Sequence, residues 1–104
     1  MNLTTHVLDT SRGRPAGGMP IRLERQDGRE WRLVTEARAD PDGRAGCEVD
    51  QPGRYQLHFA TGEYFGDDAF YPWVTVTFRI ADPGEHYHVP LLISPFGYST
   101  YRGS

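Results

Sequence analysis

Apolar and polar residues alternate along most of the chain, and this pattern predicts short β-strands separated by tight turns. The clearest case runs from Val74 to Ile80, where apolar side chains at every second position alternate with Thr75, Thr77 and Arg79. Side chains two residues apart in a strand share a face, so one face of this segment is apolar. Similar segments cover residues 4–9, 21–26, 31–35, 47–49, 55–59, 86–94 and 98–102. About eight strands at this spacing are typical of a β-sandwich.

Turn residues separate these segments, and little of the chain is left for helices. Asp27-Gly28, Pro52-Gly53 and Pro83-Gly84 each join two strand-like segments and are typical turn pairs. Residues 61–67 form the one segment that we expect to be helical, with about one or two turns. No linker or internal repeat interrupts the 104 residues. We therefore expect residues 1–104 to form a single all-β domain with one core.

The segment 86–94 is apolar on both of its faces, which indicates that the fold extends beyond one chain. The core face carries Tyr87, Val89, Leu91 and Ile93, and the outer face carries His86, His88, Pro90 and Leu92. A single exposed leucine is common on protein surfaces. A strand that is apolar on both faces is more often covered on both faces. We expect a second copy of this chain to provide that cover, because most oligomers are symmetric assemblies of identical chains.

Composition and charge exclude several classes of partner. The net charge of −3 provides no basic surface for nucleic acid or acidic lipid. The N-terminal residues do not resemble a signal peptide, and no apolar stretch approaches the length of a membrane span. The single cysteine, Cys47, cannot form an internal disulfide, and we expect it to be a buried structural thiol. These features predict a cytoplasmic protein.

Histidine and arginine are the residue types that could carry chemistry. His86 and His88 project to the same side of a strand, and with His6 they could form a zinc site of three histidines. Alternatively they are polar side chains on a sheet surface, or neutral imidazoles that transfer protons without a metal. Arg44 follows the Asp42-Gly43 turn. It is either a solvated turn residue or a planar cation that clamps an anionic or carbonyl oxygen.

Two long motifs at opposite ends of the chain resemble those of one enzyme family. The C-terminal motif is HYHVPLLISPFGYSTYRGS, residues 86–104, and the N-terminal motif is LTTHVLDT, residues 3–10. Asp42-Gly43-Arg44 and Phe70-Tyr71-Pro72 lie between them and also match. Together these residues resemble the transthyretin-like 5-hydroxyisourate hydrolases. The resemblance spans essentially the whole chain. In addition, the many aromatic residues near the C-terminus predict that this segment packs against the rest of the protein.

The resemblance implies a fold, an assembly and a reaction. The implied fold is a transthyretin-like, or prealbumin-like, β-sandwich of two four-stranded sheets with one short helix. The implied assembly is a homotetramer with its sites at the dimer–dimer interface. The implied reaction is hydrolysis of 5-hydroxyisourate to 2-oxo-4-hydroxy-4-carboxy-5-ureidoimidazoline in urate degradation, without metal or other cofactor. The alternative function is that of a non-catalytic small-molecule carrier of the transthyretin type, because that carrier shares the fold.

The family's site residues transfer to matching positions of this sequence. The resemblance implies catalytic roles for His6, Arg44, His88 and Ser104, and substrate binding by His6, Arg44 and Tyr101. His86 also matches the motif, and we rank it behind His88. These assignments come from the family motifs, whereas the residues alone leave the zinc site and the metal-free site open.

Overall fold

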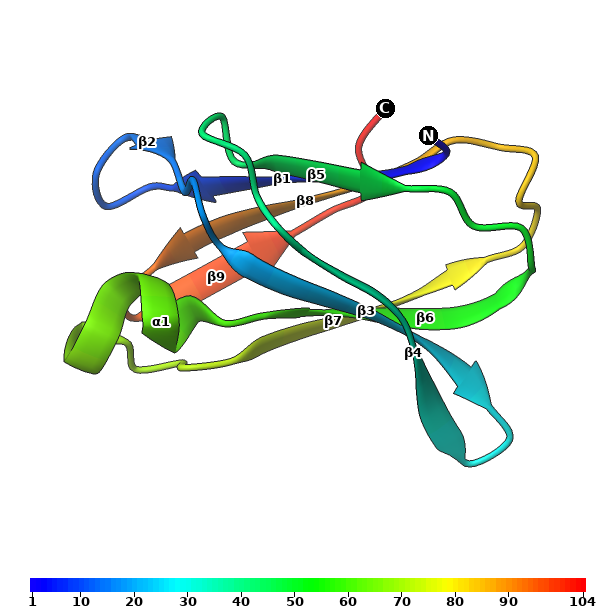
Figure 1. Ribbon diagram of the computed structural model, residues 1–104. Coiled ribbons are helices and arrows are strands. Elements are labelled where there is room, and N and C mark those ends of the chain that lie inside the picture. The colour runs from blue at the N-terminus through cyan, green and yellow to red at the C-terminus, as the bar shows by residue number, and fades with distance from the viewer.

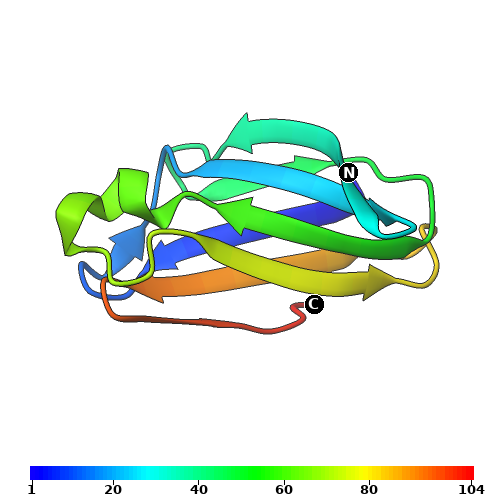
Figure 2. The same cartoon turned by 90° about the horizontal axis from the view of Figure 1, so that it is seen from below.

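The protein is described by a computed structural model of residues 1–104, in which two β-sheets pack face to face (Figure 1). The strands are β1 (Leu3–Asp9), β2 (Arg14–Pro15), β3 (Pro20–Asp27), β4 (Glu30–Arg38), β5 (Arg44–Cys47), β6 (Gly53–Phe59), β7 (Val74–Ile80), β8 (Tyr87–Ser94) and β9 (Gly97–Thr100). Helix α1 (Thr61–Phe65) and the 3₁₀-helix η1 (Gly66–Asp68) follow β6. Helix α1 lies at the end of the sandwich away from both termini (Figures 1 and 2).

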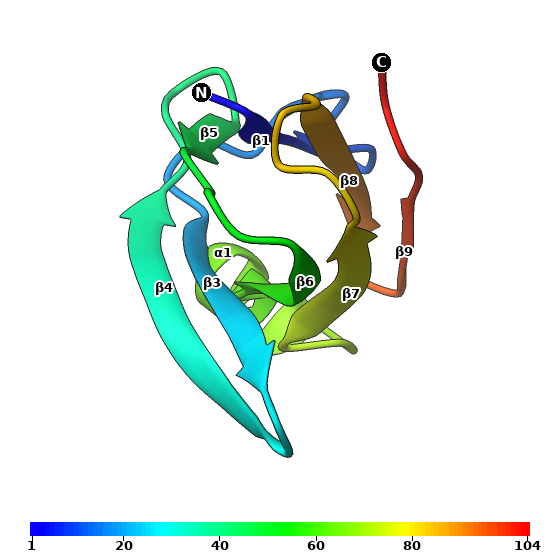
Figure 3. The ribbon, with the colours of Figure 1, turned by 90° about the vertical axis from the view of Figure 1, so that its right-hand side faces the viewer.

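The sandwich consists of one five-stranded and one four-stranded sheet. The second sheet has the order β4-β3-β6-β7, and in the first sheet β1, β8 and β9 are neighbours in that order. The free edge of β1 is shared: residues 3–6 pair with β5, and residues 8–9 pair with the two-residue strand β2. The predicted sandwich of two sheets with one short helix is confirmed, but the first sheet has five strands and not four, because β2 and β5 share one edge of β1. Figure 3 shows the two layers end on.

The alternation read from the sequence determines which side chains enter the core. Strand β1 buries every second residue, and in β6 the buried side chains are Tyr55, Leu57 and Phe59. In β8 the predicted core face of Tyr87, Val89, Leu91 and Ile93 is buried, as expected. Burial of these large apolar side chains from both sheets is the main source of stability for a sandwich of this size.

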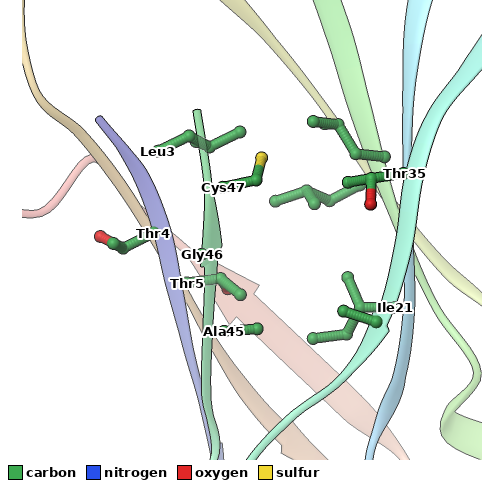
Figure 4. A pocket seen from close by; sticks show the side chains of 11 residues that line it. Leu3, Thr4, Thr5, Ile21, Thr35, Ala45, Gly46 and Cys47 are labelled. Carbon is green, nitrogen blue, oxygen red and sulfur yellow. The ribbon is translucent and has the colours of Figure 1, made fainter. Parts of the chain in front are cut away.

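A small void remains between the sheets beside the short strand β5 (Figure 4). Leu3, Ala45 and Cys47 face Ile21 and Thr35 across it, and its volume is ≈ 30 Å³. Ligand sites for small molecules usually have volumes of about 300 Å³ or more, so this void is not one of them. Cys47 is half-buried with its side chain against the core. Burial raises the pKa of its thiol, which is consistent with the predicted structural role.

Some boundaries differ from the sequence-based expectation. The predicted helix over 61–67 is present, but only its first turn is α-helical and the rest is 3₁₀. Strand β2 was not predicted, because its two residues include a proline and cannot show alternation. The predicted strand at 47–49 lies earlier, at Arg44–Cys47, because the Val49 N–H donates to the Asn2 side chain and not to a strand. No helix of the structure has the length and apolar character needed to cross a membrane.

The buried carboxylate of Asp9 connects the end of β1 to helix α1. It accepts hydrogen bonds from the backbone N–H and hydroxyl of Ser11, at 2.9 and 2.6 Å, and from the Tyr64 hydroxyl at 2.9 Å. Burial by itself would raise the pKa of Asp9, but the hydrogen bonds from Ser11, Tyr64 and Arg12 outweigh it and lower the pKa. The ionised carboxylate therefore holds the β1–β2 loop and α1 together.

Candidate active site

Strand pairing brings three of the predicted site residues onto the outer face of the first sheet. In the antiparallel pair of β1 and β5, His6 lies opposite Arg44. In the parallel pair of β1 and β8, Thr4 lies opposite His88. Directly paired residues project to the same face of a sheet, and the alternate residues of β1 are buried in the core. Thr4, His6, Arg44 and His88 therefore share the outer face.

A depression of ≈ 470 Å³ lies on this face, within the size range of small-molecule sites. Thr4, Arg44, His86, His88 and Ser104 are among its lining residues. The other lining residues are Met1, Thr5, Asp40, Ala45 and Gly46. His6 is not among the lining residues, but it lies opposite Arg44 on the same face, and its charge contributes to the lowered pKa of His88. The protomer thus brings four predicted site residues to one region.

Tyr101 is the predicted site residue that the protomer places elsewhere. Its side chain is 61% exposed and lines a separate depression over β7 and β8, beside Phe78 and Arg102. It is absent from the lining of the depression that contains His88. Any contact of Tyr101 with a molecule bound near His88 therefore requires a neighbouring copy of the chain or a rearrangement of the C-terminal segment.

The turn before β5 holds both Arg44 and His6. The Asp40 carboxylate accepts hydrogen bonds at 2.9 Å from the backbone N–H groups of Asp42 and Arg44. Gly43 has φ +79°, and a side chain there would collide with the Val7 carbonyl. The Asp42 carbonyl accepts a hydrogen bond of 2.9 Å from His6 Nε2. Because a carbonyl only accepts, Nε2 carries the hydrogen, and neutral His6 keeps a free lone pair on Nδ1.

The Arg44 side chain is exposed and has no partner in the protomer. Its backbone N–H is bound to Asp40, but the guanidinium is absent from every ion pair and side-chain hydrogen bond of the chain. A guanidinium presents a planar fork of donors that suits carboxylate, carbonyl or enolate oxygens. Arg44 is thus available to bind an oxygen-rich molecule in the depression.

The imidazole of His88 is held on two sides. Its Nδ1 lies 2.8 Å from the Thr4 hydroxyl. On the other side, a Cβ placed on Gly103 would lie 2.5 Å from His88 Cδ2, so only glycine fits there. Nε2 has no hydrogen-bond partner in the protomer, and His88 lines the depression. Nε2 is therefore the nitrogen available to a bound molecule or water.

Its surroundings favour the neutral form of His88. Burial lowers the pKa of His88, and the nearby charges of Arg44, His6 and His86 lower it further. A neutral imidazole has a lone pair that can accept a proton near neutral pH. His88 thus combines a fixed orientation, one free nitrogen and a protonation state suited to a base.

The C-terminal segment docks against β8, as the sequence predicted. The Gly103 N–H donates to the His88 carbonyl at 2.8 Å. The Arg102 guanidinium lies 4.5 Å from the centroid of the Tyr87 ring and donates to the His86 carbonyl at 3.3 Å. A cation over an aromatic face is an attractive contact. These contacts hold Ser104 at the rim of the depression.

A second polar depression, of ≈ 370 Å³, lies on the outer face of the other sheet and contains His58. Both ring nitrogens of His58 already have partners: Nε2 lies 2.8 Å from Glu24 Oε1, and Nδ1 lies 2.8 Å from the Thr75 hydroxyl. His58 therefore offers no free nitrogen. The depression with His88 and Arg44 is the better candidate for chemistry.

Sequence reasoning did not identify Thr4 or the Asp42 carbonyl. Thr4 lies two residues before the motif residue His6 and on the same face of the strand, but threonine is too common in strands to mark a site. A backbone carbonyl has no signature in a sequence. His6, His86 and His88 do not form a group arranged to hold a metal ion, and no other three His, Cys, Asp or Glu side chains do so.

Comparisons with known proteins show which proteins this chain resembles. A model of the HIUase/Transthyretin family matches residues 3–103. A protein of Rhizobium meliloti (strain 1021) is named 5-hydroxyisourate hydrolase 2. It is 48% identical to this chain in an alignment 118 residues long, which covers 98% of this chain and 95% of the relative.

Two solved structures have the same fold. The 5-hydroxyisourate hydrolase of Klebsiella pneumoniae has a TM-score of 0.86 and 34% identity, with all of both chains covered. Sea bream transthyretin in complex with thyroxine has a TM-score of 0.90 and 25% identity, covering 99% of this chain and 95% of that one.

Proposed function

The chain belongs to the HIUase/Transthyretin family, and on that premise we propose that it hydrolyses 5-hydroxyisourate. The observation that carries the proposal is the pairing of two unoccupied groups at one depression: Nε2 of His88 and the guanidinium of Arg44. The proposed product is 2-oxo-4-hydroxy-4-carboxy-5-ureidoimidazoline, which places the reaction in urate degradation. The names of the relatives support this substrate.

The proposed reaction opens a cyclic amide with water. A bond forms between the water oxygen and the C6 carbonyl carbon, and the bond between C6 and N1 breaks. One water proton ends on N1, and the other leaves as the carboxylate forms. Such a reaction needs a base beside the water, a cation beside the developing oxyanion, and a donor for the departing nitrogen.

The two histidines are proposed to position and deprotonate the water. His88 presents Nε2 as its one free nitrogen, and its lowered pKa keeps it neutral. His6 keeps a lone pair on Nδ1, because its Nε2–H is bound to the Asp42 carbonyl. A histidine that has taken the proton from water can then return it to N1, so that acid and base roles alternate.

Arg44 and Ser104 are proposed to bind the substrate and its charge. The unpaired guanidinium of Arg44 suits the anionic or carbonyl edge of the ring and the oxyanion that forms during attack. Ser104 lies at the rim of the same depression and can orient the ring by hydrogen bonding. Tyr101 is proposed to contribute from a neighbouring copy of the chain or after movement of its segment. No metal or other cofactor is proposed.

The proposed assembly is a homotetramer with sites at the dimer–dimer interface. The same outer face carries Leu8 and Leu92, which lie opposite each other in the β1–β8 pair and are half-buried in the protomer. An apolar strip beside a polar depression is typical of a surface that another subunit covers. A second copy over this strip would also enclose the depression and exclude bulk water, which strengthens electrostatic interactions within it.

The alternative function is that of a carrier, which the likeness to sea bream transthyretin would suit. Fold does not decide between the two, because one fold hosts many functions. The free Nε2 of His88 beside Arg44 favours hydrolysis, since binding alone does not require a base.

The test is an assay of hydrolysis. 5-Hydroxyisourate is generated in situ from urate with urate oxidase. The decay of its ultraviolet absorbance is then followed in the presence of a chelator, with and without this protein. We expect faster decay with the protein, and loss of the acceleration in His88→Ala. If a folded, assembled protein does not accelerate the decay, the carrier function replaces the proposal.

A further inference from the structure

We propose that Thr4 is a positioning residue that fixes the tautomer of His88 and couples it to His86. In this arrangement the Nδ1–H of His88 donates to the Thr4 hydroxyl, and the hydroxyl hydrogen is donated to Nε2 of His86. Nε2 of His88 then keeps its lone pair toward the depression. The inference rests on the proposed function, because water activation is what requires that lone pair.

The first observation is the position of the Thr4 hydroxyl between two histidines. Thr4 Oγ1 lies 2.8 Å from His88 Nδ1 and 3.3 Å from His86 Nε2. A hydroxyl has one hydrogen and two lone pairs, so it can donate to one imidazole while it accepts from the other. Two bonds that run in the same direction along such a chain strengthen each other. The three side chains therefore act as one hydrogen-bonded unit.

The second observation is that the backbone fixes this hydroxyl. Thr4 lies directly opposite His88 in the parallel pair of β1 and β8. A threonine side chain is stiff at χ1, and the Thr4 methyl group lies against Gly46 of β5. The hydroxyl thus has little freedom to leave Nδ1. On its other side the His88 ring is confined by Gly103.

The direction of the hydrogen bonds decides what His88 can do. If Thr4 donated to Nδ1, then Nε2 would carry the hydrogen of the neutral ring and could not accept a proton from water. The opposite direction leaves Nε2 free to accept, and it requires an acceptor for the Thr4 hydrogen. His86 Nε2 is in place for that role. This assigns a function to His86, which is exposed and otherwise contacts the C-terminal segment only through its backbone.

The ionisable neighbours of His88 are Arg44 of β5, His6 of β1 and His86, which precedes β8. The charge of Arg44, and those of His6 and His86 when they are protonated, disfavour a second proton on His88. The ring then carries one proton, and whether Nδ1 or Nε2 holds this proton decides whether His88 can accept another from water. Thr4 is the one side chain that contacts either nitrogen in the protomer.

A spectroscopic test needs no substrate, so it separates this inference from the proposed function. Long-range ¹H–¹⁵N correlation spectra of the histidine rings distinguish a protonated nitrogen from a bare one. At a pH where His88 is neutral, we expect the wild-type ring to be protonated at Nδ1 and bare at Nε2. We expect Thr4→Val, which keeps the shape and the methyl contacts, to give a mixture of both tautomers. A wild-type ring protonated at Nε2 would overturn the inference whether or not the protein hydrolyses 5-hydroxyisourate.

Kinetics supply the second readout. We expect Thr4→Val to lower kcat about tenfold, the size of one lost hydrogen bond, with little change in KM. Thr4→Ser restores the hydroxyl and should recover most of kcat. Thr35→Val is the matched control, because Thr35 is a half-buried strand threonine whose hydroxyl contacts no histidine.

His86→Leu probes the far end of the unit at an exposed position where folding is not at risk. It frees the Thr4 hydrogen to reverse toward Nδ1, so we expect a mixture of both His88 tautomers to appear and kcat to fall about threefold. If Thr4→Val and His86→Leu both keep the wild-type spectrum and kcat while His88→Ala is inactive, Thr4 is not a positioning residue, although the hydrolase function stands.

Discussion

The backbone N–H of Gly103 donates to the carbonyl of His88 at 2.8 Å, which brings the C-terminal segment against the imidazole. A strand residue normally shares its carbonyl with a neighbouring strand, but here a single bridge takes that place. The consequence is that the orientation of His88 depends on a residue 15 positions later that has no side chain.

Replacement of Gly103 by alanine should therefore impair turnover more than stability. A methyl group would lie 2.5 Å from His88 Cδ2, so either the ring or the segment must move. We expect a large loss of kcat with a small change in the denaturant midpoint. Gly97→Ala is the control, because a Cβ there meets only the Ser94 hydroxyl, at 3.8 Å. Equal kcat values for the two variants would contradict a role for this contact.

Arg44→Ala should lower turnover by about 10²–10³, the usual effect of removing one electrostatic donor from a developing oxyanion. The fold should remain intact, since the Arg44 side chain has no partner in the protomer and the turn is held by the backbone bonds to Asp40. Steady-state kinetics and circular dichroism measure the two effects. Turnover close to that of the wild type would remove Arg44 from the oxyanion role.

The pH dependence of kcat/KM should report His88. A base must be neutral, so activity is present above its pKa and is lost as the pH falls through that pKa. Because the pKa of His88 is lowered from 6.5, the acid loss should occur below pH 6.5. Arg44→Gln removes one charge that lowers this pKa, so the acid limb should move to higher pH. Arg79→Gln on β7 is the control, and it should not change the pH at which kcat/KM is lost in acid.

Asp9 should make the fold sensitive to acid. Its pKa is lowered in the folded chain, so its contribution to stability is present above the ordinary value of 3.8 and is lost as the pH falls through the folded pKa. Tyr64→Phe removes one hydrogen bond to this buried carboxylate. We expect it to lower the free energy of unfolding by about 1–3 kcal/mol. Tyr98→Phe serves as the control. Equal denaturant midpoints for the two variants would contradict the role of the Asp9 carboxylate in anchoring helix α1.

Leu92→Glu should disrupt the proposed tetramer. The change places a charge on the half-buried apolar strip of the outer face, where a covering subunit would have to bury it. Light scattering after size-exclusion chromatography would then give a smaller mass than for the wild type. Leu33→Glu changes an exposed leucine of β4 in the other sheet and should not alter the mass. A wild-type mass for Leu92→Glu would place the interface elsewhere.

Period-two alternation was sufficient to predict the sandwich, because burial of one face in each strand is a local property of the sequence. It also separated the two faces of β8, on which Leu91 is fully buried and Leu92 half-buried, although Pro90 of the outer face is buried as well. The short strand β2 was missed, and β9 ends at Thr100, two residues before the predicted end of its segment, since both depend on pairing partners and not on side-chain pattern.

The candidate site was predicted from motifs only as a set of residues. That His6 lies opposite Arg44, and Thr4 opposite His88, follows from strand register, which no local pattern encodes. The hydrogen bond from His6 to the Asp42 carbonyl depends on the Asp40 turn, in which Gly43 has a positive φ. The separate location of Tyr101 likewise reflects the path of the C-terminal segment.

The parallel pairing of β1 with β8 has a consequence for folding. Thr4 and His88 are 84 residues apart in the chain, and closure of so long a loop is entropically costly until the intervening hairpins offer a surface to dock on. High contact order of this kind makes the pairing a late event. We therefore expect recovered activity during refolding to lag behind recovered strand content. A chain cleaved between the two strands could still form the β3–β4 hairpin, but it could not form the site unless both fragments reassembled.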